Sequence, residues 1–424
     1  ALAALFLYPW IMKKNLILSF VILLLIYGML ESTFLWWFPR VFPSNAQVFI
    51  EEGFRPLLQS SKRSFLPHNY IAILGDSYAQ GMGDWASAEM NKPMARYHSA
   101  HILQDAIGKD VVSFGSAGAG SVRAMVTEPI SQLAFIRRYV NKAVEQPEWI
   151  LVYFYEGNDL YDNASYYHYS FPRLFDEKKQ YDAETYQRYL KKFAVERDAT
   201  WQSAQTSNWR LHLPFANFLD KVVRTLSGMA QAPASVVSGF DDTLDPPWIF
   251  GGASYKEPGT INQASINGET IQLPDQLQGP ALNLDAEEWQ QAWFAFEQAF
   301  LFSRQSFPDS HYVLVYIPSV ISCYTLASEK VSLQSYERRE GVFPASMVQA
   351  KSLQMRTALK DFAQKYDLPI IDATDAMREA ATHHALHGPG DWNHPNKYGY
   401  ESLTTALLNQ MRPMLVDKEA YNHK

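Results

Sequence analysis

The stretch YIAIL (residues 70–74), followed directly by GDSYAQG (residues 75–81), decides the fold. An apolar run of this length before a glycine predicts a buried β-strand, and the Gly-Asp-Ser sequence predicts a tight turn. The turn would present the Ser77 hydroxyl at the carboxyl end of the strand, where the next helix starts. Residues that follow other strands of the same sheet would lie close to this hydroxyl.

Similar apolar runs recur along the chain and alternate with helix-length patterns. This alternation predicts an α/β fold with a parallel sheet covered by helices on both faces. Ligands of such sheets bind beyond the carboxyl ends of the strands, so chemistry is expected in the residues after each strand. The further strands are predicted at residues 111–114, 149–154, 312–317 and 368–371, and the helices at residues 96–106, 122–144, 286–306, 347–365 and 397–411.

Composition narrows the class of protein. The 424 residues are 47% hydrophobic and only 19% charged, which is typical of a globular chain with a large core. The formal net charge is −7 and no basic block occurs, so we expect no nucleic acid as a partner. The single cysteine, Cys323, cannot form an intramolecular disulfide and is predicted to be a small buried apolar residue.

The N-terminal residues predict a membrane anchor. Residues 15–30 (NLILSFVILLLIYGML) carry no charge, and an aromatic run at residues 34–38 follows Glu31, the one charged residue of the span. No small-x-small cleavage site follows, which favours an uncleaved signal anchor over a signal peptide. Lys13 and Lys14 precede the span and should stay in the cytoplasm, so the chain after about Arg40 is expected on the other side.

This reading divides the chain into segments. Residues 1–40 form the anchor and residues 41–69 a linker, followed by the first part of the core at residues 70–160. Residues 161–284 are too long for one crossover and are interpreted as an insertion or cap. It should contain helices at residues 183–193 and 215–226 and hairpin-like pieces within residues 251–273. Residues 285–424 complete the core.

Four short motifs carry residues suited to acyl transfer. GDSYAQG supplies Ser77, SFGSAG (residues 113–118) ends in Gly118, EGND (residues 156–159) contains Asn158, and GDWNHP (residues 390–395) contains Asp391 and His394. Each motif alone is commonplace, because serines cap helices and Asn-Asp pairs form turns. Together they offer a nucleophile, a base held by a carboxylate, and donors for a tetrahedral oxyanion.

The four motifs and their order resemble those of the SGNH (GDSL-type) hydrolase superfamily over residues 70–411. The resemblance implies a flavodoxin-like fold with Ser77 as nucleophile, His394 as base and Asp391 as its partner. It also implies an oxyanion hole formed by Ser77, Gly118 and Asn158. The chain departs from the family in two respects: Ser113 stands where the second motif often has Asn, and the long insertion is not part of the minimal fold.

We therefore expect a single-pass serine esterase or O-acyltransferase of a bacterial inner membrane, facing the periplasm or the outside. The family analogy favours O-acetyl groups of envelope glycans as substrate. Two alternatives remain open: a lipase or thioesterase acting on membrane-derived esters, and a non-catalytic subunit that binds another membrane protein. No cofactor is expected. His383, His384 and His387 could share a helix face, but no acidic residue or cysteine nearby completes a zinc site, so no metal is predicted.

Overall fold

The computed structural model describes residues 2–140, 144–170, 182–203, 212–231, 258–334 and 341–416. Its centre is a five-stranded sheet in the order β2-β1-β3-β7-β11, and all neighbouring strands run parallel. The α/β fold expected from the sequence is thereby confirmed. This strand order is that of flavodoxin-like doubly wound sheets, whose order reverses between the first and third strands. The strands are β1 (Ile71–Leu74), β2 (Val111–Ser113), β3 (Trp149–Tyr155), β7 (His311–Ile317) and β11 (Ile370–Asp372).

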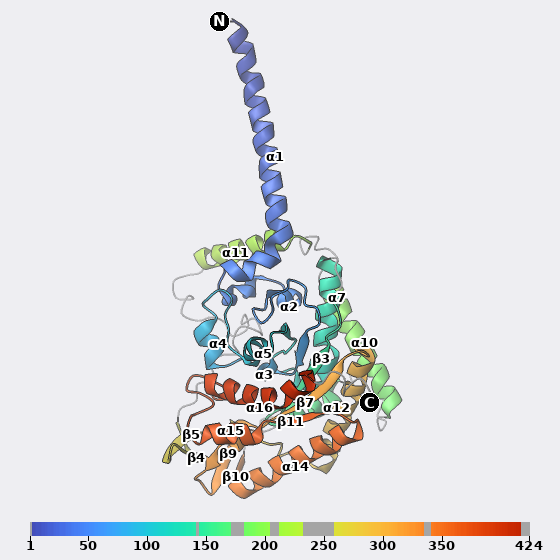
Figure 1. Cartoon of the computed structure of the whole chain (residues 1–424), viewed down its shortest axis with the longest axis vertical. Coiled ribbons are helices and arrows are strands. Elements are labelled where there is room, and N and C mark those ends of the chain that lie inside the picture. The colour runs from blue at the N-terminus through green and yellow to red at the C-terminus, as the bar shows by residue number, and fades with distance from the viewer. Residues whose placement is uncertain are drawn as a thin grey trace.

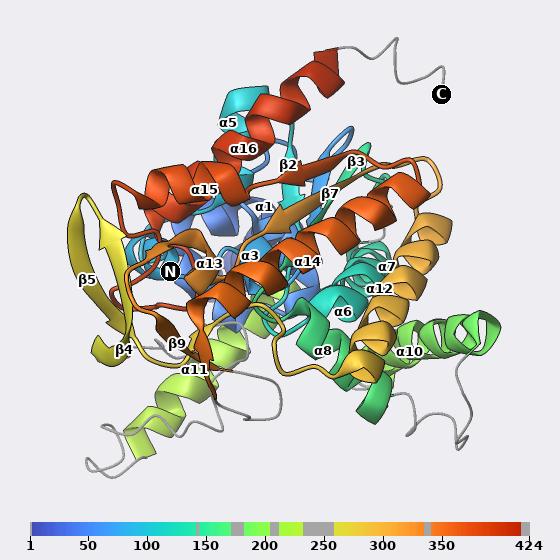
Figure 2. The ribbon, with the colours of Figure 1, turned by 90° about the horizontal axis from the view of Figure 1, so that it is seen from below.

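Helices cover both faces of the sheet (Figure 2). Alternate strand residues point to opposite faces, so Ala72 and Leu74 contribute to one core cluster and Ile71 and Ile73 to the other. The first face is covered by α6 (Gly120–Val126), α8 (Asp159–Ser165), α12 (Ala286–Ser306) and α14 (Ala345–Lys365). The second is covered by α5 (Ser99–Ile107), α15 (Thr374–Ala381) and α16 (Lys397–Val416). Cys323 is fully buried in the second cluster, as the sequence predicts.

The helix predicted at residues 122–144 is divided in two. Helix α6 ends at Val126 and α7 (Glu128–Val140) begins two residues later. Pro129 explains the division, because a proline is tolerated in the first turn of a helix but removes a backbone donor from a helix interior.

The N-terminal helix α1 (Leu2–Val41) extends from the globular part (Figure 1). Its residues Asn15–Val41 form a helix long and apolar enough to cross a membrane, and the most apolar 18 residues of this helix have a mean hydropathy of 2.1. Side chains from Leu16 to Met29 are exposed, whereas Phe34 and Phe38 are fully buried against the domain. The helix thus continues from an apolar rod into the core of the globular part.

Residues 41–69, expected to be a linker, are folded onto the domain. They form η1 (Ser44–Phe49), η2 (Glu52–Phe54) and α2 (Arg55–Leu58). Phe54, Leu57 and Leu58 are buried in a third apolar cluster together with Phe34 of α1. Short helical turns without hydrophobic periodicity give little signal in a sequence, which is why this segment was not predicted.

Residues 161–284, predicted to be an insertion, contain helices and strands at the predicted places, and the helices are longer than predicted. These are α10 (Ala183–Ser203), α11 (Pro214–Gln231), and the antiparallel strands β4 (Pro258–Ile266) and β5 (Glu269–Pro274). The predicted hairpin region at residues 251–257 lies outside the described residues. Helix α8, which crosses the expected boundary at residue 161, belongs to the layer covering the sheet.

The remaining elements are short. Strand β4 also pairs with β8 (Thr325–Leu326), and a second small sheet has the order β10-β9-β6. The strands of this sheet are β6 (Leu277–Gln278), β9 (Lys330–Gln334) and β10 (Gly341–Pro344). The short helices are α3 (Ser77–Gln80), α4 (Asp84–Glu89), η3 (Tyr166–Ser170) and α13 (Val320–Cys323).

Candidate active site

Ser77 and Asn158 follow the two strands between which the sheet order reverses. Ser77 is the first residue of α3, directly after β1, and Asn158 is the N-cap of α8, directly after β3. The Asp76 carboxylate caps α3 by accepting a hydrogen bond from the Tyr78 N–H at 2.9 Å. Ser77 is only 6% exposed, so access to its hydroxyl is narrow. The crevice at such a reversal is where open α/β sheets bind ligands.

His394 and Asp391 form a close pair in the turn before α16. Nδ1 of His394 lies 2.6 Å from Oδ2 of Asp391, and the other carboxylate oxygen accepts from the Asn393 N–H at 3.0 Å. Both side chains are largely buried, at 15% and 9% exposure for His394 and Asp391. An Nδ1–H donated to a carboxylate leaves Nε2 as the acceptor, which is the tautomer that a general base requires.

The turn carrying His394 packs against the segment that carries Ser77. The rings of Tyr78 and His394 have centroids 5.9 Å apart, and the Tyr78 hydroxyl donates to the Asn393 carbonyl at 3.1 Å. A side chain at Gly83 would come within 3.2 Å of the His394 Cβ and still closer to the backbone of Pro395. Within the described part of the chain no hydrogen bond joins the Ser77 hydroxyl to the His394 ring. Catalytic hydrogen bonds of ligand-free enzymes are often long and tighten when substrate binds.

Gly118 lies in the loop after β2, which is fastened to the nucleophile helix. The Ser113 hydroxyl donates to the Ala79 carbonyl and accepts from the Gly115 N–H at 3.0 Å. Oε1 of Gln80 accepts from the Ala117 N–H at 2.7 Å. Ser113 therefore connects this loop to α3.

The backbone at Gly118 suits an approaching ligand. Its φ of +62° is in the left-handed region that favours glycine, and a Cβ built there would meet no atom within 4 Å. Among the described residues, none accepts a hydrogen bond from the backbone N–H of Gly118 or of Ser77. Both donors are therefore available to a substrate oxygen.

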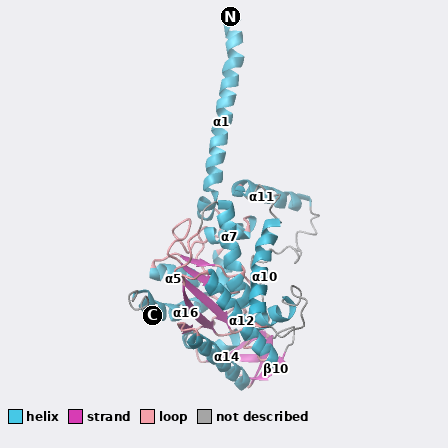
Figure 3. Ribbon diagram, turned by 90° about the vertical axis from the view of Figure 1, so that its right-hand side faces the viewer, coloured by secondary structure: helices cyan, strands magenta, loops and turns pink. Residues whose placement is uncertain are grey.

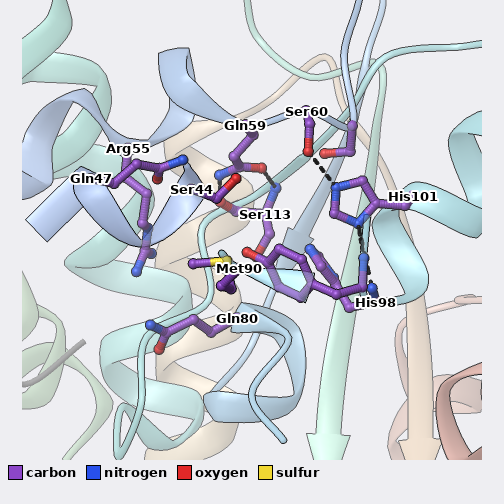
Figure 4. Close-up of a pocket in the computed structure, with 12 residues that line it drawn as sticks. Ser44, Gln47, Arg55, Gln59, Ser60, Gln80, Met90, His98, His101 and Ser113 are labelled. Atoms are coloured by element: carbon purple, nitrogen blue, oxygen red, sulfur yellow. Dashed lines mark hydrogen bonds between the residues drawn. The ribbon is translucent and has the colours of Figure 1, made fainter. Parts of the chain in front are cut away.

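A polar cavity of about 60 Å³ lies behind this loop (Figure 4). Gln59 accepts from the Ser113 N–H at 2.8 Å and donates to the Ser113 carbonyl at 2.6 Å, and Arg55 donates to the Gly115 carbonyl. Gln80 lines the same cavity from the other side. These contacts fix the start of the loop that carries Gly118. Arg55 and Gln59 were not predicted from the sequence, because they lie in the segment expected to be a linker.

Glu156, the first residue of EGND, is a structural acceptor that sequence reasoning missed. Its carboxylate is fully buried and accepts hydrogen bonds from four hydroxyl groups. Two of these bonds, from Ser319 and Ser352, measure 2.6 Å. The donors are the hydroxyls of Tyr316, Ser319, Ser322 and Ser352. This network fixes the turn after β3 and, with it, the position of Asn158.

Two buried carboxyls, those of Asp76 and Asp159, and the partly buried carboxyl of Asp162 lie near Asn158. Burial raises the pKa of Asp76, while the Tyr78 N–H, the charge of His394 and the Asn158 amide act in the opposite direction. Burial and the charge of Asp76 raise the pKa of Asp162 to about 8 against the effect of Arg123, and Asp159 is shifted upward in the same way. A pKa of about 8 means that the Asp162 carboxyl is mostly protonated at neutral pH.

The histidines considered for a metal do not share a helix face. Helix α15 ends at Ala381, before His383, His384 and His387. His387 is fully buried and contacts the hydroxyls of Tyr78 and Tyr324 at 3.4 and 3.2 Å. Burial and the charge of His394 lower its pKa to about 3, so it stays neutral. No group of three or more potential metal ligands occurs within the residues that the structure describes.

Comparison with known proteins adds no assignment. No protein-family model matches the sequence, and no curated protein is significantly similar to it.

Proposed function

We propose that the protein is a membrane-anchored serine esterase or O-acyltransferase. The observation that carries the proposal is the His394–Asp391 pair, packed against the turn that begins with Ser77. A serine hydroxyl is a poor nucleophile until a base accepts its proton, and a carboxylate on Nδ1 orients that base and stabilises its charged form. Acyl transfer also needs hydrogen-bond donors for the oxyanion, and the backbone N–H groups of Ser77 and Gly118 could serve as these donors.

In the proposed mechanism the Ser77 hydroxyl attacks the carbonyl carbon of an ester while Nε2 of His394 accepts its proton. The resulting oxyanion accepts hydrogen bonds from the N–H groups of Ser77 and Gly118 and from the side-chain amide of Asn158. An amide has two N–H hydrogens, so Asn158 can interact with Asp76 and still donate to the oxyanion. Each such donor contributes about 3 kcal/mol to transition-state stabilisation.

Collapse of the tetrahedral intermediate breaks the ester bond, and His394 returns the proton to the leaving alcohol. The acyl group is then carried by Ser77. Water releases it as a carboxylic acid, whereas a hydroxyl of a second substrate accepts it as a new ester. Hydrolysis and transfer therefore differ only in the acceptor.

The substrate that we favour is an O-acetylated glycan of the cell envelope. The 6% exposure of Ser77 and 15% exposure of the His394 side chain support a small acyl group, because a long chain needs an open apolar channel. The alternatives are a lipase or thioesterase that draws esters from the bilayer, and a scaffold without catalysis that binds a membrane protein.

Helix α1 supports the anchoring, and Lys13 and Lys14 support an orientation with the catalytic domain in the periplasm or outside. Protease treatment of intact spheroplasts tests this orientation. Digestion of the large domain is expected, and its protection would reverse the assignment.

Catalysis is tested with a small activated acetate ester. The wild type and Ser87→Ala should hydrolyse it, whereas Ser77→Ala should lose the activity while keeping the thermal unfolding midpoint of the wild type. Ser87 is a suitable control because its hydroxyl only reaches the Gly83 carbonyl at 3.4 Å, next to the site. A wild type that is folded and inert would favour the scaffold.

A series of esters from acetyl to long acyl chains separates the two enzymatic readings. A steep preference for short chains supports the glycan substrate. Activity that rises with chain length favours the lipase or thioesterase.

A further inference from the structure

Helix α11 is held across the end of the exposed part of α1 (Figures 1 and 3). The Glu31 carboxylate of α1 accepts hydrogen bonds from the first free backbone N–H groups of α11, those of Phe215 at 2.7 Å and Ala216 at 3.2 Å. Glu31 also accepts from the Tyr27 hydroxyl at 2.9 Å. Glu31, the acidic residue of the apolar span, thus caps a helix whose first bonded residue lies 184 positions further along the chain.

One side of α11 packs on α1 and on the segment after it. The rings of Phe215 and Phe218 both lie 5.4 Å from the ring of Phe34. Phe218 also contacts Phe42 at 5.2 Å and is only 6% exposed. This aromatic contact fixes α11 at the level where α1 enters the globular part.

A second side of α11 is polar and faces the domain. Nδ2 of Asn217 donates to Oε1 of Glu51 at 3.3 Å, and the Lys221 ammonium pairs with the same oxygen at 2.7 Å. Asn217 and Lys221 are four residues apart, so they lie on one face of the helix. This polar face of α11 therefore points toward the globular domain.

The opposite side of α11 is apolar and exposed. Leu219, Val223 and Leu226 are 43%, 59% and 61% exposed. Leu219 lies two residues after Asn217, and Val223 lies two residues after Lys221. Two residues correspond to a rotation of about 200° around the axis of a helix. The three apolar side chains therefore point away from the domain, toward the side from which α1 extends.

We propose that α11 lies flat in the surface of the membrane that α1 spans, with Leu219, Val223 and Leu226 in the outer part of the lipid. The inference rests on the anchoring proposed above. Two observations support it independently. Contacts with Glu31 and Phe34 fix the position of α11 along α1, and the apolar face of α11 points away from the domain. Helices of this kind bury their apolar face about 5–10 Å into the boundary between headgroups and acyl chains.

The contact gives the domain a second attachment. A single span lets a domain swivel and tilt, whereas a helix pressed flat on the same surface sets one tilt. The height of the Ser77 turn above the membrane is then fixed by the fold, which limits the substrates it can reach to those at that distance.

The test measures quenching of a fluorophore on single introduced cysteines in the full chain, reconstituted in phospholipid vesicles. The native Cys323 is fully buried and will not take up the label. The positions are Val223→Cys on the apolar face, Arg224→Cys next to it on the polar side, Leu23→Cys in α1, and Leu353→Cys. Leu353 is a matched exposed apolar control, 60% exposed on α14, at the end of the domain remote from α1 (Figure 1).

Quenching by nitroxide-labelled lipid is expected to be several-fold stronger at residues 23 and 223 than at residues 224 and 353, and quenching by iodide should show the reverse order. Strong lipid quenching at residue 23 with iodide quenching at residue 223 would overturn the inference and leave the anchor intact. A label at residue 223 shielded from both quenchers would show that a protein covers this face, which also overturns the inference. Lipid quenching at neither residue 23 nor residue 223 would refute the anchoring itself.

Discussion

Nδ1 of His394 lies 2.6 Å from Oδ2 of Asp391, and the same carboxylate accepts the Asn393 N–H with its second oxygen. The Asn393 N–H therefore orients the Asp391 carboxylate, and the carboxylate orients the imidazole of His394. This pairing leaves Nε2 of His394 as the acceptor. The His394 ring lies 5.9 Å from the ring of Tyr78, the residue that follows Ser77 in α3.

The substitution Asp391→Asn should leave the fold intact and remove the correct tautomer of His394. An amide can donate to Nδ1 and force the proton onto Nε2, where it blocks the base. We expect kcat for an acetate ester to fall by about 10³–10⁴-fold. Asp375→Asn, at a carboxylate 90% exposed, serves as the control and should be unchanged. Equal rates for both variants would mean that the pair is only structural.

Asn158→Ala tests the oxyanion donor. Because this donor acts on charge that develops in the transition state, kcat should fall by about 10²–10³-fold while KM changes little. Steady-state kinetics with the acetate ester measure both constants. A rise in KM with an unchanged kcat would assign Asn158 to ground-state binding instead.

Arg55 should act on the reaction without touching the substrate. Its guanidinium holds the Gly115 carbonyl, and its loss should loosen the loop that carries Gly118. We expect Arg55→Met to lower kcat about tenfold, because small displacements of oxyanion donors are costly. The matched control is Arg96→Met, because Arg96 pairs with Asp105 and binds the Ser60 carbonyl rather than the loop. If both variants lose activity equally, the effect is one of folding.

Glu156→Gln should destabilise the protein. An amide in place of the carboxylate presents hydrogen atoms to at least one hydroxyl that previously donated to it, and the site is fully buried. Hydrogen bonds to a charged group contribute about 1.5–3 kcal/mol, and the free energy of unfolding should fall by about that amount. Urea unfolding of the full chain in detergent measures it. An unchanged midpoint would show that the network carries no stability.

The lowered pKa of His387 predicts that the folded protein loses stability in acid. Its pKa is about 3 in the folded protein and near its ordinary 6.5 in the unfolded chain, so the unfolded chain binds a proton first as the pH falls. The free energy of unfolding should therefore decrease between pH 6.5 and pH 3. His387→Gln keeps a polar side chain but cannot be protonated, and its stability should depend less on pH in this window. Parallel pH profiles for the two proteins would contradict the assignment.

Much of the fold could be predicted because its elements have strong local signals. The strand at Ile71–Leu74 is an uninterrupted apolar run, and helix α12 is bounded by the capping residue Asp285 with Glu288 three residues later. The division between α6 and α7 was missed, although Pro129 marks it. Residues 41–69 were missed for a different reason, since their short turns are stabilised by contacts with α1 and not by periodicity.

The candidate site was predictable only in part. Motifs identified Ser77, Gly118, Asn158, Asp391 and His394, and the structure brings the segments that carry them to one edge of the sheet. The supporting residues Arg55, Gln59 and Glu156 depend on partners far away in the sequence. Glu31 illustrates the same limit, because a charge that looks misplaced in an apolar helix has its partners at Phe215 and Ala216.

The most direct test of the proposed nucleophile is the mass of the intact protein after reaction with a fluorophosphonate. We predict one adduct per chain, located by peptide mapping on Ser77, and its absence from Ser77→Ala and from His394→Ala. A folded wild type that remains unmodified, or an adduct on another residue, would contradict the assignment of Ser77 as a nucleophile activated by His394.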